Sequence, residues 1–86
     1  MPVPSGSQSP PGPLARAISA QFRILMAEQN WTAVGLARAA GLSRSYLGKR
    51  LRDEAAFTSN DIEALLEVLG VDILTFANDA VRRVKK

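Results

Sequence analysis

The sequence contains no cysteine and no histidine among its 86 residues. These two absences exclude disulfide bonds, zinc sites built on thiolate or imidazole ligands, and a histidine general base. The carboxylates show no calcium-loop spacing, and no nucleophile–base pair or phosphate-binding loop is present. We therefore expect no enzymatic activity, no cofactor, no metal ion and no small-molecule ligand.

Long apolar runs are also missing. No run approaches the roughly 18 residues that a membrane span needs. The first residues lack the basic start and apolar stretch of a signal peptide. We expect a soluble, cytoplasmic protein without a membrane partner.

Proline is confined to one end of the chain, at Pro2, Pro4, Pro10, Pro11 and Pro13. Glycine and serine fill the gaps between these prolines, and neither lysine nor arginine occurs before residue 14. Such a composition cannot build a helix or a core. We expect residues 1–13 to be a disordered tail and residues 14–86 to be one domain.

Apolar residues recur at helical spacing in that domain, and no strand-like alternation appears. The pattern predicts helices near residues 13–29, 33–40, 44–52, 59–69 and 72–84. Stop signals and N-caps separate them at Asn30, Thr32, Gly41, Ser43, Thr58 and Gly70. The predicted core stripes are Leu14, Ile18, Phe22, Leu25 and Met26, then Leu36, Leu47, Leu51, Ile62, Leu65, Leu66 and Leu69, then Ile73, Phe76, Ala77, Ala80 and Val84, with Trp31 as an apolar plug. The fold class is all-α, a compact bundle of five helices.

Charge is unevenly distributed along the chain, although the net charge is only +3. Residues 38–52 carry five bases and no acid, residues 53–79 carry seven acids and no base, and residues 80–86 carry four bases. This segregation favours a polyanion on one face of the molecule. A solvated charged helix is the alternative interpretation.

The basic block coincides with a helix, a tight turn at Gly41 and a second helix capped by Ser43. An exposed helix start of this kind fits the DNA major groove. We expect base contacts from Arg44, Ser45 and Lys49. The candidate backbone or groove contacts are Ser43, Tyr46, Arg38, Arg50 and Arg52. For Tyr46 the alternative is a place at the edge of the core. We expect Gly48 to let a base or a phosphate come close to the helix, and the alternative is a role in relieving crowding within the helix.

Residues 36–47, together with residues 61–71 ending in Leu69-Gly70-Val71, resemble the phage-repressor and Cro-like helix-turn-helix family, also called XRE or lambda-repressor-like. The resemblance covers about residues 14–76. It implies a five-helix bundle whose third helix reads operator DNA while the start of the second helix holds the DNA backbone.

The chain departs from the family pattern at three places. Ala33 stands where members often have a phosphate-binding glutamine, which puts that contact in doubt. Met26 and Leu51 replace a buried Arg–Glu pair, a swap that is coherent because both charged partners are absent. Arg50 replaces an apolar residue, so we expect it to be more exposed than its family counterpart.

We therefore predict a sequence-specific double-stranded DNA-binding transcription regulator, a phage-type repressor or Cro-like protein, at the nucleoid of a bacterial cell. A homodimer through residues 72–84 is an additional expectation. The alternative is an antitoxin-like protein-interaction module that uses the acidic face and the apolar last helix. Attachment of residues 72–86 to a membrane surface is disfavoured by Asp72 and Asp79.

Overall fold

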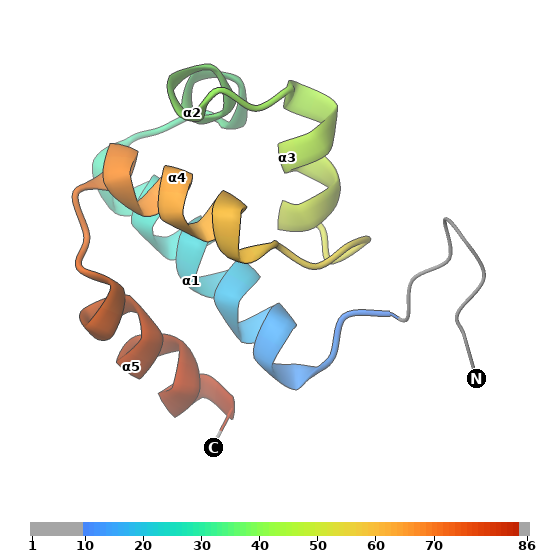
Figure 1. The fold of residues 1–86 in the computed structure, drawn as a ribbon, viewed down its shortest axis with the longest axis vertical. Helices are drawn as coiled ribbons and strands as arrows, with labels where there is room; N and C mark the ends of the chain where they lie inside the picture. Colours follow the sequence, from blue (N-terminus) through green and yellow to red (C-terminus); the bar gives the residue numbers. More distant parts are fainter. Residues whose placement is uncertain (1–9, 85–86) are drawn as a thin grey trace.

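The computed structural model describes residues 10–84, which form five α-helices and no strand. The helices are α1 (Pro13–Gln29), α2 (Ala33–Ala40), α3 (Arg44–Leu51), α4 (Ser59–Leu69) and α5 (Ile73–Val84) (Figure 1). The predicted all-α, five-helix fold is confirmed, with each helix end within one residue of its expected place. The predicted tail falls largely in residues 1–9, which lie outside the described residues, as do Lys85 and Lys86.

Three of the four connections between helices share one design, in which a left-handed residue is followed by an apolar residue and then by a cap. The left-handed residues are Asn30, Gly41 and Gly70, with φ of 61°, 74° and 70°. Glycine and asparagine reach this region at low steric cost, which is why the helices end there. The sequence signals for these three stops are confirmed.

Hydrogen bonds close each of these corners locally. The backbone N–H groups of the apolar residues Trp31, Leu42 and Val71 reach back to the last turn of the preceding helix. The next residue along the chain is the N-cap of the following helix. Thr32 Oγ1 accepts the Gly35 N–H at 3.0 Å, and Asp72 Oδ2 accepts the Leu74 N–H at 2.9 Å. These short corners fix the angles at which successive helices meet.

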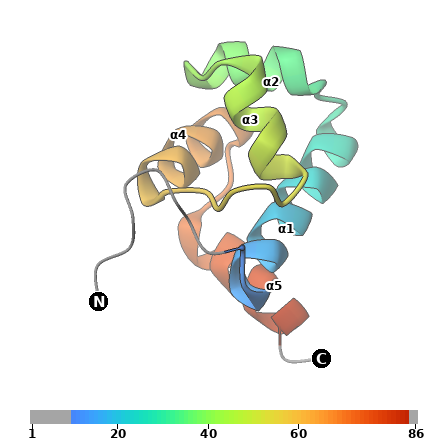
Figure 2. The same cartoon turned by 90° about the vertical axis from the view of Figure 1, so that its right-hand side faces the viewer.

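The core is centred on Phe22 of α1, which is fully buried. Its ring centroid lies 4.9 Å from that of Phe57 and 4.5 Å from that of Phe76, so α1, the α3–α4 connection and α5 meet there. The surrounding buried residues are Leu25, Leu36, Ala37, Leu47, Leu51, Leu65, Leu66 and Leu69. In Figures 1 and 2, α5 lies along α1, and α2 and α3 lie at the other end of the molecule.

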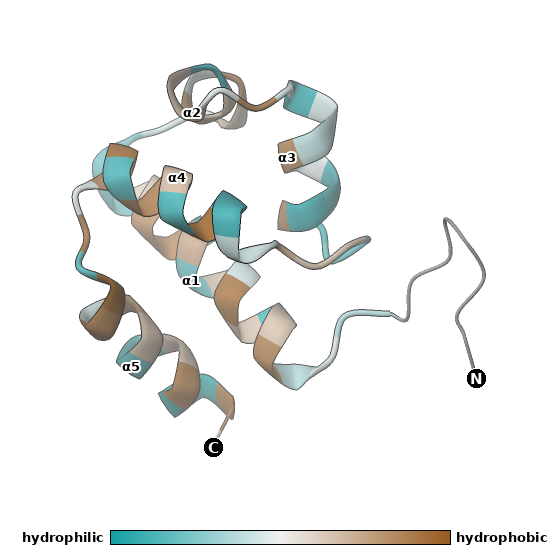
Figure 3. Cartoon of the chain, viewed as in Figure 1, coloured by the Kyte–Doolittle hydropathy of each residue, from teal (hydrophilic) through white to brown (hydrophobic). Residues whose placement is uncertain are grey.

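The predicted core stripes are wrong at their ends. Leu14, Ile73 and Val84 are 50%, 53% and 40% exposed. The reason for Ile73 and Val84 is that α5 packs on α1 by one side only. Figure 3 shows apolar segments, in brown, along the length of α5, more than this one contact covers. Trp31 packs against the core but stays partly exposed, and its indole N–H donates to Gln29 Oε1.

No helix within residues 10–84 is long and apolar enough to cross a membrane.

Candidate nucleic-acid interface

The turn between α2 and α3 sets the geometry of the basic face. Gly41 ends α2 with φ of 74°, Leu42 packs against the core, and Ser43 Oγ accepts the Tyr46 N–H at 3.1 Å. Leu47 and Leu51 bury the inner face of α3, so its other face is turned to solvent. Figure 2 shows α3 at the front of the molecule, with the other helices behind or beside it.

The solvent face of α3 carries the predicted base-contacting side chains. Arg44, Ser45 and Lys49 are all exposed, as is the cap Ser43. Arg44 and Lys49 make no ion pair or hydrogen bond through their charged groups in the described part of the chain. Their charged groups are therefore available to an external anion.

The flanking arginines Arg38 and Arg52 are exposed too, but they differ in their partners. Arg38 has no ion pair among residues 10–84. Arg52 Nε donates to Glu54 Oε2 at 2.7 Å, and this hydrogen bond lowers the pKa of Glu54. Arg52 is therefore already partly neutralised at the surface.

Two other predicted contacts, Tyr46 and Arg50, are drawn into an internal cluster with Asp61 of α4. The Tyr46 hydroxyl donates to the Asp61 carboxylate, with oxygen–oxygen distances of 2.8 and 3.0 Å. The guanidinium carbon of Arg50 lies 3.5 Å from the centroid of the Tyr46 ring, and its Nε lies 3.5 Å from Asp61 Oδ2. We call these three residues the Tyr46–Arg50–Asp61 cluster.

The expectation that Arg50 is more exposed is wrong. Its side chain is only 12% exposed, and that of Asp61 only 7%. The reason is the carboxylate of Asp61, which supplies a buried counter-charge where the family pattern has an apolar contact. The Tyr46 hydroxyl likewise points to α4.

Asp61 also completes the cap of α4. Its N–H donates to Thr58 Oγ1 at 3.1 Å, and its Oδ2 accepts the Thr58 N–H at 3.0 Å. This is the capping box expected from the sequence. A single carboxylate therefore caps α4, accepts the Tyr46 hydroxyl and faces Arg50.

The hydrogen bond to Asp61, helped by desolvation and by the negative charge of Asp61, raises the pKa of Tyr46 above its ordinary value of 10.0. The chain has one tyrosine, so absorbance of the tyrosinate reports this residue alone. We expect a spectrophotometric titration to find Tyr46 ionising above pH 10.0. Because the fold favours the protonated phenol, this stabilisation is complete below that pH and is lost as pH rises through the raised pKa.

The matched variant for this titration is Asp61→Asn, which removes the charge while keeping a side-chain acceptor. Its Tyr46 pKa should fall back toward the ordinary value. A parent protein that titrates at or below the ordinary value would contradict the cluster.

Two residues that the sequence analysis missed hold the other end of α3. Ser19 Oγ donates to the carbonyls of Arg50 and Leu51 at 3.1 and 3.3 Å, and Arg23 Nη1 donates to the Leu51 carbonyl at 2.6 Å. These bonds satisfy carbonyls that lack partners at a helix C-terminus. The available signal was a serine among the apolar residues of α1, with an arginine one turn later.

Gly48 and the two remaining departures from the family pattern have packing counterparts. A Cβ at Gly48 would lie 2.9 Å from Arg52 Nη1, so the glycine lets the Arg52 side chain fold across α3. Met26 and Leu51 both pack in the core, in line with the expected apolar swap. Ala33 is the first residue of α2 and packs against the core, and its side chain has no polar group for a phosphate.

Comparison with known families now decides the assignment. A family model described as a helix-turn-helix domain matches residues 17–76, which is most of the chain. The chain belongs to the helix-turn-helix domain family. This membership supports the predicted function class, a DNA-binding transcription regulator.

Solved structures share the helix-turn-helix fold of this chain. The clp gene regulator ClgR from Corynebacterium glutamicum is 23% identical with a TM-score of 0.79, over 90% of this chain and 81% of that chain. A point mutant of the restriction-modification controller protein C.Esp1396I is 20% identical with a TM-score of 0.79, over 87% of this chain and 100% of that chain. At these identities the likeness establishes the fold. No curated protein sequence matches the chain.

Proposed function

We propose that this protein binds double-stranded DNA in a sequence-specific manner, with α3 in the major groove, and regulates transcription as a repressor of the phage or Cro-like type. The observation that carries the proposal is the exposed face of α3, where Arg44 in the first turn and Lys49 in the last turn make no ion pair with the described residues. A helix that presents unpaired cations beside a steep turn matches the docking of this motif in the groove.

Each exposed residue has a role that its chemistry allows. Arg44 can donate two hydrogen bonds to a guanine edge, and Lys49 can contact the same edge of a neighbouring pair. Ser45 is short and polar, so it lets the helix backbone approach the bases. Ser43 and the free amides of the first turn suit a phosphate, and Arg38 and Arg52 flank the groove. We assign no phosphate to Tyr46 or Arg50, because their polar side-chain groups face Asp61 or the backbone of α3.

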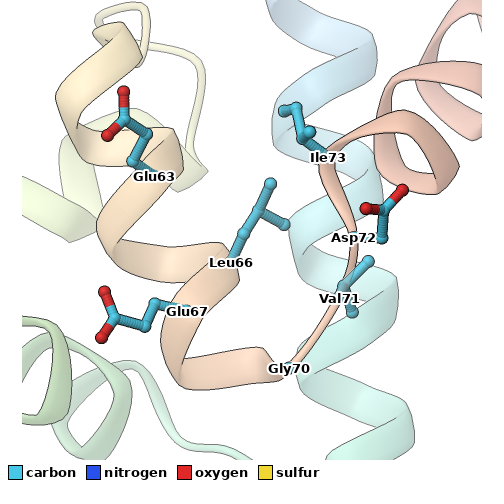
Figure 4. Close-up of a pocket in the computed structure, with 7 residues that line it drawn as sticks. All are labelled: Glu63, Leu66, Glu67, Gly70, Val71, Asp72 and Ile73. Carbon is cyan, nitrogen blue, oxygen red and sulfur yellow. The ribbon is translucent and has the colours of Figure 1, made fainter.

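We further propose that two copies associate through α5. Its exposed apolar residues, Ile73, Leu74, Val81 and Val84, form an uncovered surface. Beside it lies a hollow of about 720 Å³ between α4 and the α4–α5 connection, with Leu66 and Ile73 inside and Glu63, Glu67 and Asp72 at its rim (Figure 4).

Charge complementarity favours a second copy as the occupant of this surface. An antiparallel pair of α5 helices would bring Asp72, directly before the start of one helix, to Arg82 and Arg83 at the end of the other. The arrangement is self-complementary about a two-fold axis, as a homodimer requires. It would also present two α3 helices to successive turns of DNA.

The same acidic hollow favours a second candidate function, a protein-interaction module with a basic partner. The slope of the salt dependence on duplex DNA tests the first candidate, because DNA binding releases the condensed counterions of the phosphates. The logarithm of the DNA association constant should fall with the logarithm of salt concentration by about 0.9 per neutralised phosphate.

The experiment that tests the proposed function is selection of bound sites from a random DNA pool. We expect an enriched sequence with guanine at the position read by Arg44, and a palindromic consensus if α5 pairs two copies. A pool that shows no enrichment after repeated rounds, with binding insensitive to salt, would refute DNA reading. A single half-site would refute the dimer alone.

A further inference from the structure

We propose that the Tyr46–Arg50–Asp61 cluster sets the rotation of α3 about its own axis and thereby aligns the side chains that read DNA. The three residues are positioning residues, since none of them is required to touch a base. The inference rests on the proposed function. It adds specificity-determining residues on α4 and on the inner edge of α3, away from the DNA-facing surface.

The apolar contacts of α3 leave its rotation weakly fixed. The helix is short, Arg44–Leu51, and only Leu47 and Leu51 are buried beneath it. Apolar contacts are non-directional, so two leucines permit a helix to roll over the core. Hydrogen bonds are directional and do not permit such rolling.

The cluster supplies this directional restraint at two successive turns of α3. Tyr46 donates to Asp61 at 2.8 Å, and Arg50, one turn later, lies 3.5 Å from the same carboxylate. Arg50 Nη1 also donates to the Tyr46 carbonyl at 3.2 Å, which ties the two turns together. The carboxylate itself is held by the capping box of α4.

Each anchored residue is the chain neighbour of a proposed reading residue. Ser45 precedes Tyr46, and Lys49 precedes Arg50. A roll of α3 that breaks the bonds to Asp61 must therefore shift Ser45 and Lys49 together. The Ser19 and Arg23 bonds to the last carbonyls of α3 hold its C-terminal end, and the cluster holds the turns next to Ser45 and Lys49.

The cluster is poorly suited to a purely stabilising role. Arg50 Nε is buried and makes no hydrogen bond with any of residues 10–84. A buried polar group without a partner opposes folding, and replacing a buried ion pair by apolar residues is often neutral or stabilising. An orienting role accounts for keeping a charged pair where the fold alone would accept apolar residues.

Charge gives the decisive test, because positioning and electrostatics predict opposite changes in affinity for the selected DNA site when the negative charge of Asp61 is removed. Removing its negative charge makes the protein more positive and, by electrostatics alone, strengthens binding to any DNA. If Asp61 aligns α3, the same change weakens binding to the selected site. Glu28→Gln is the matched control, since Glu28 is an exposed acid on α1 and lies outside the cluster.

The experiment measures the affinity of the full chain and its variants for the selected site and for random duplex DNA, at several salt concentrations. We expect Asp61→Asn and Arg50→Met each to lower the ratio of specific to random affinity by about tenfold, the loss of one misaligned base contact. The salt dependence should stay at the parent value. Glu28→Gln should leave the ratio unchanged.

Tyr46→Phe guards against variants that fail to fold, because it removes only the hydroxyl and keeps the ring beneath Arg50. It should lower the ratio of specific to random affinity as the other two variants do. Its melting temperature is measured together with that of the parent. An unchanged ratio in Tyr46→Phe and Asp61→Asn would overturn the inference. A loss in Arg50→Met that is equal for both DNAs, with the salt slope reduced by about 0.9, would also overturn it, since Arg50 would then be a phosphate contact.

The outcomes also separate this inference from the proposed function. A parent that selects no DNA sequence refutes both. A parent that selects a site, with variants that keep the same specificity, refutes the positioning role alone.

Discussion

Gly41→Val should lower the free energy of unfolding by about 2 kcal/mol, the cost of a β-branched residue forced into the left-handed region. Gly41 has φ of 74°, and a Cβ placed there would meet no atom of residues 10–84 within 4 Å. The loss therefore comes from the backbone and not from a clash. In a domain of this size it corresponds to a fall in melting temperature of roughly 10 °C, measurable by circular dichroism.

The matched variant for this prediction is Gly41→Asn. Asparagine tolerates the left-handed region, and Asn30 already ends α1 in that conformation with φ of 61°. We expect the loss in Gly41→Asn to be the smaller of the two. Equal melting temperatures for the valine variant and the parent would show that Gly41 does not form the turn.

Arg44→Ala should weaken binding to the selected DNA site by about 1–3 kcal/mol and relax the preference at one base pair. The reason is the loss of a side chain that can donate two hydrogen bonds to guanine from the first turn of α3. Because Arg44 is exposed and its side chain has no partner among the described residues, the melting temperature should stay at the parent value. Site selection with the variant, compared with the parent, measures both effects.

Arg16→Ala is the control, since it removes the same charge from an exposed position on α1. It should leave base preference intact and change affinity only through net charge. If Arg44→Ala behaves like Arg16→Ala, the assignment of α3 as the reading helix is incorrect.

The helices and their ends were predictable because the signals for them are local. The left-handed stops at Asn30, Gly41 and Gly70, and the caps at Thr32 and Ser43, act on groups within one turn of themselves. Local hydrogen bonds of this kind depend on sequence spacing alone. The helical bounds could therefore be predicted closely without knowledge of the tertiary packing.

The cluster around Asp61 was not predictable in the same way. Asp61 lies fifteen residues from Tyr46, and nothing in the spacing says that α4 brings its first turn against α3. The departure at Arg50 was visible in the sequence, but the expected exposure was wrong. A lone arginine in an apolar position suggests exposure until its partner is found. That partner is Asp61, the acid of the capping box at the start of α4.

The bonds from Ser19 and Arg23 to the end of α3 share this difficulty. They join residues about thirty positions apart, and their acceptors are backbone carbonyls, which leave no trace in side-chain composition. The predicted burial at the ends of the core stripes was wrong for a related reason. Periodicity marks the apolar side of α5 but does not say how much of that side α1 covers.

The exposed side of α3 has a consequence for redesign. Arg44, Ser45 and Lys49 lie outside the core, whereas Tyr46, Leu47, Arg50 and Leu51 carry the internal contacts of the helix. The residues proposed to determine DNA preference and the residues that hold the fold thus occupy different positions of one eight-residue helix. A library that randomises positions 44, 45 and 49 should consist largely of folded proteins, so new DNA preferences could be sought without a compensating search for stability.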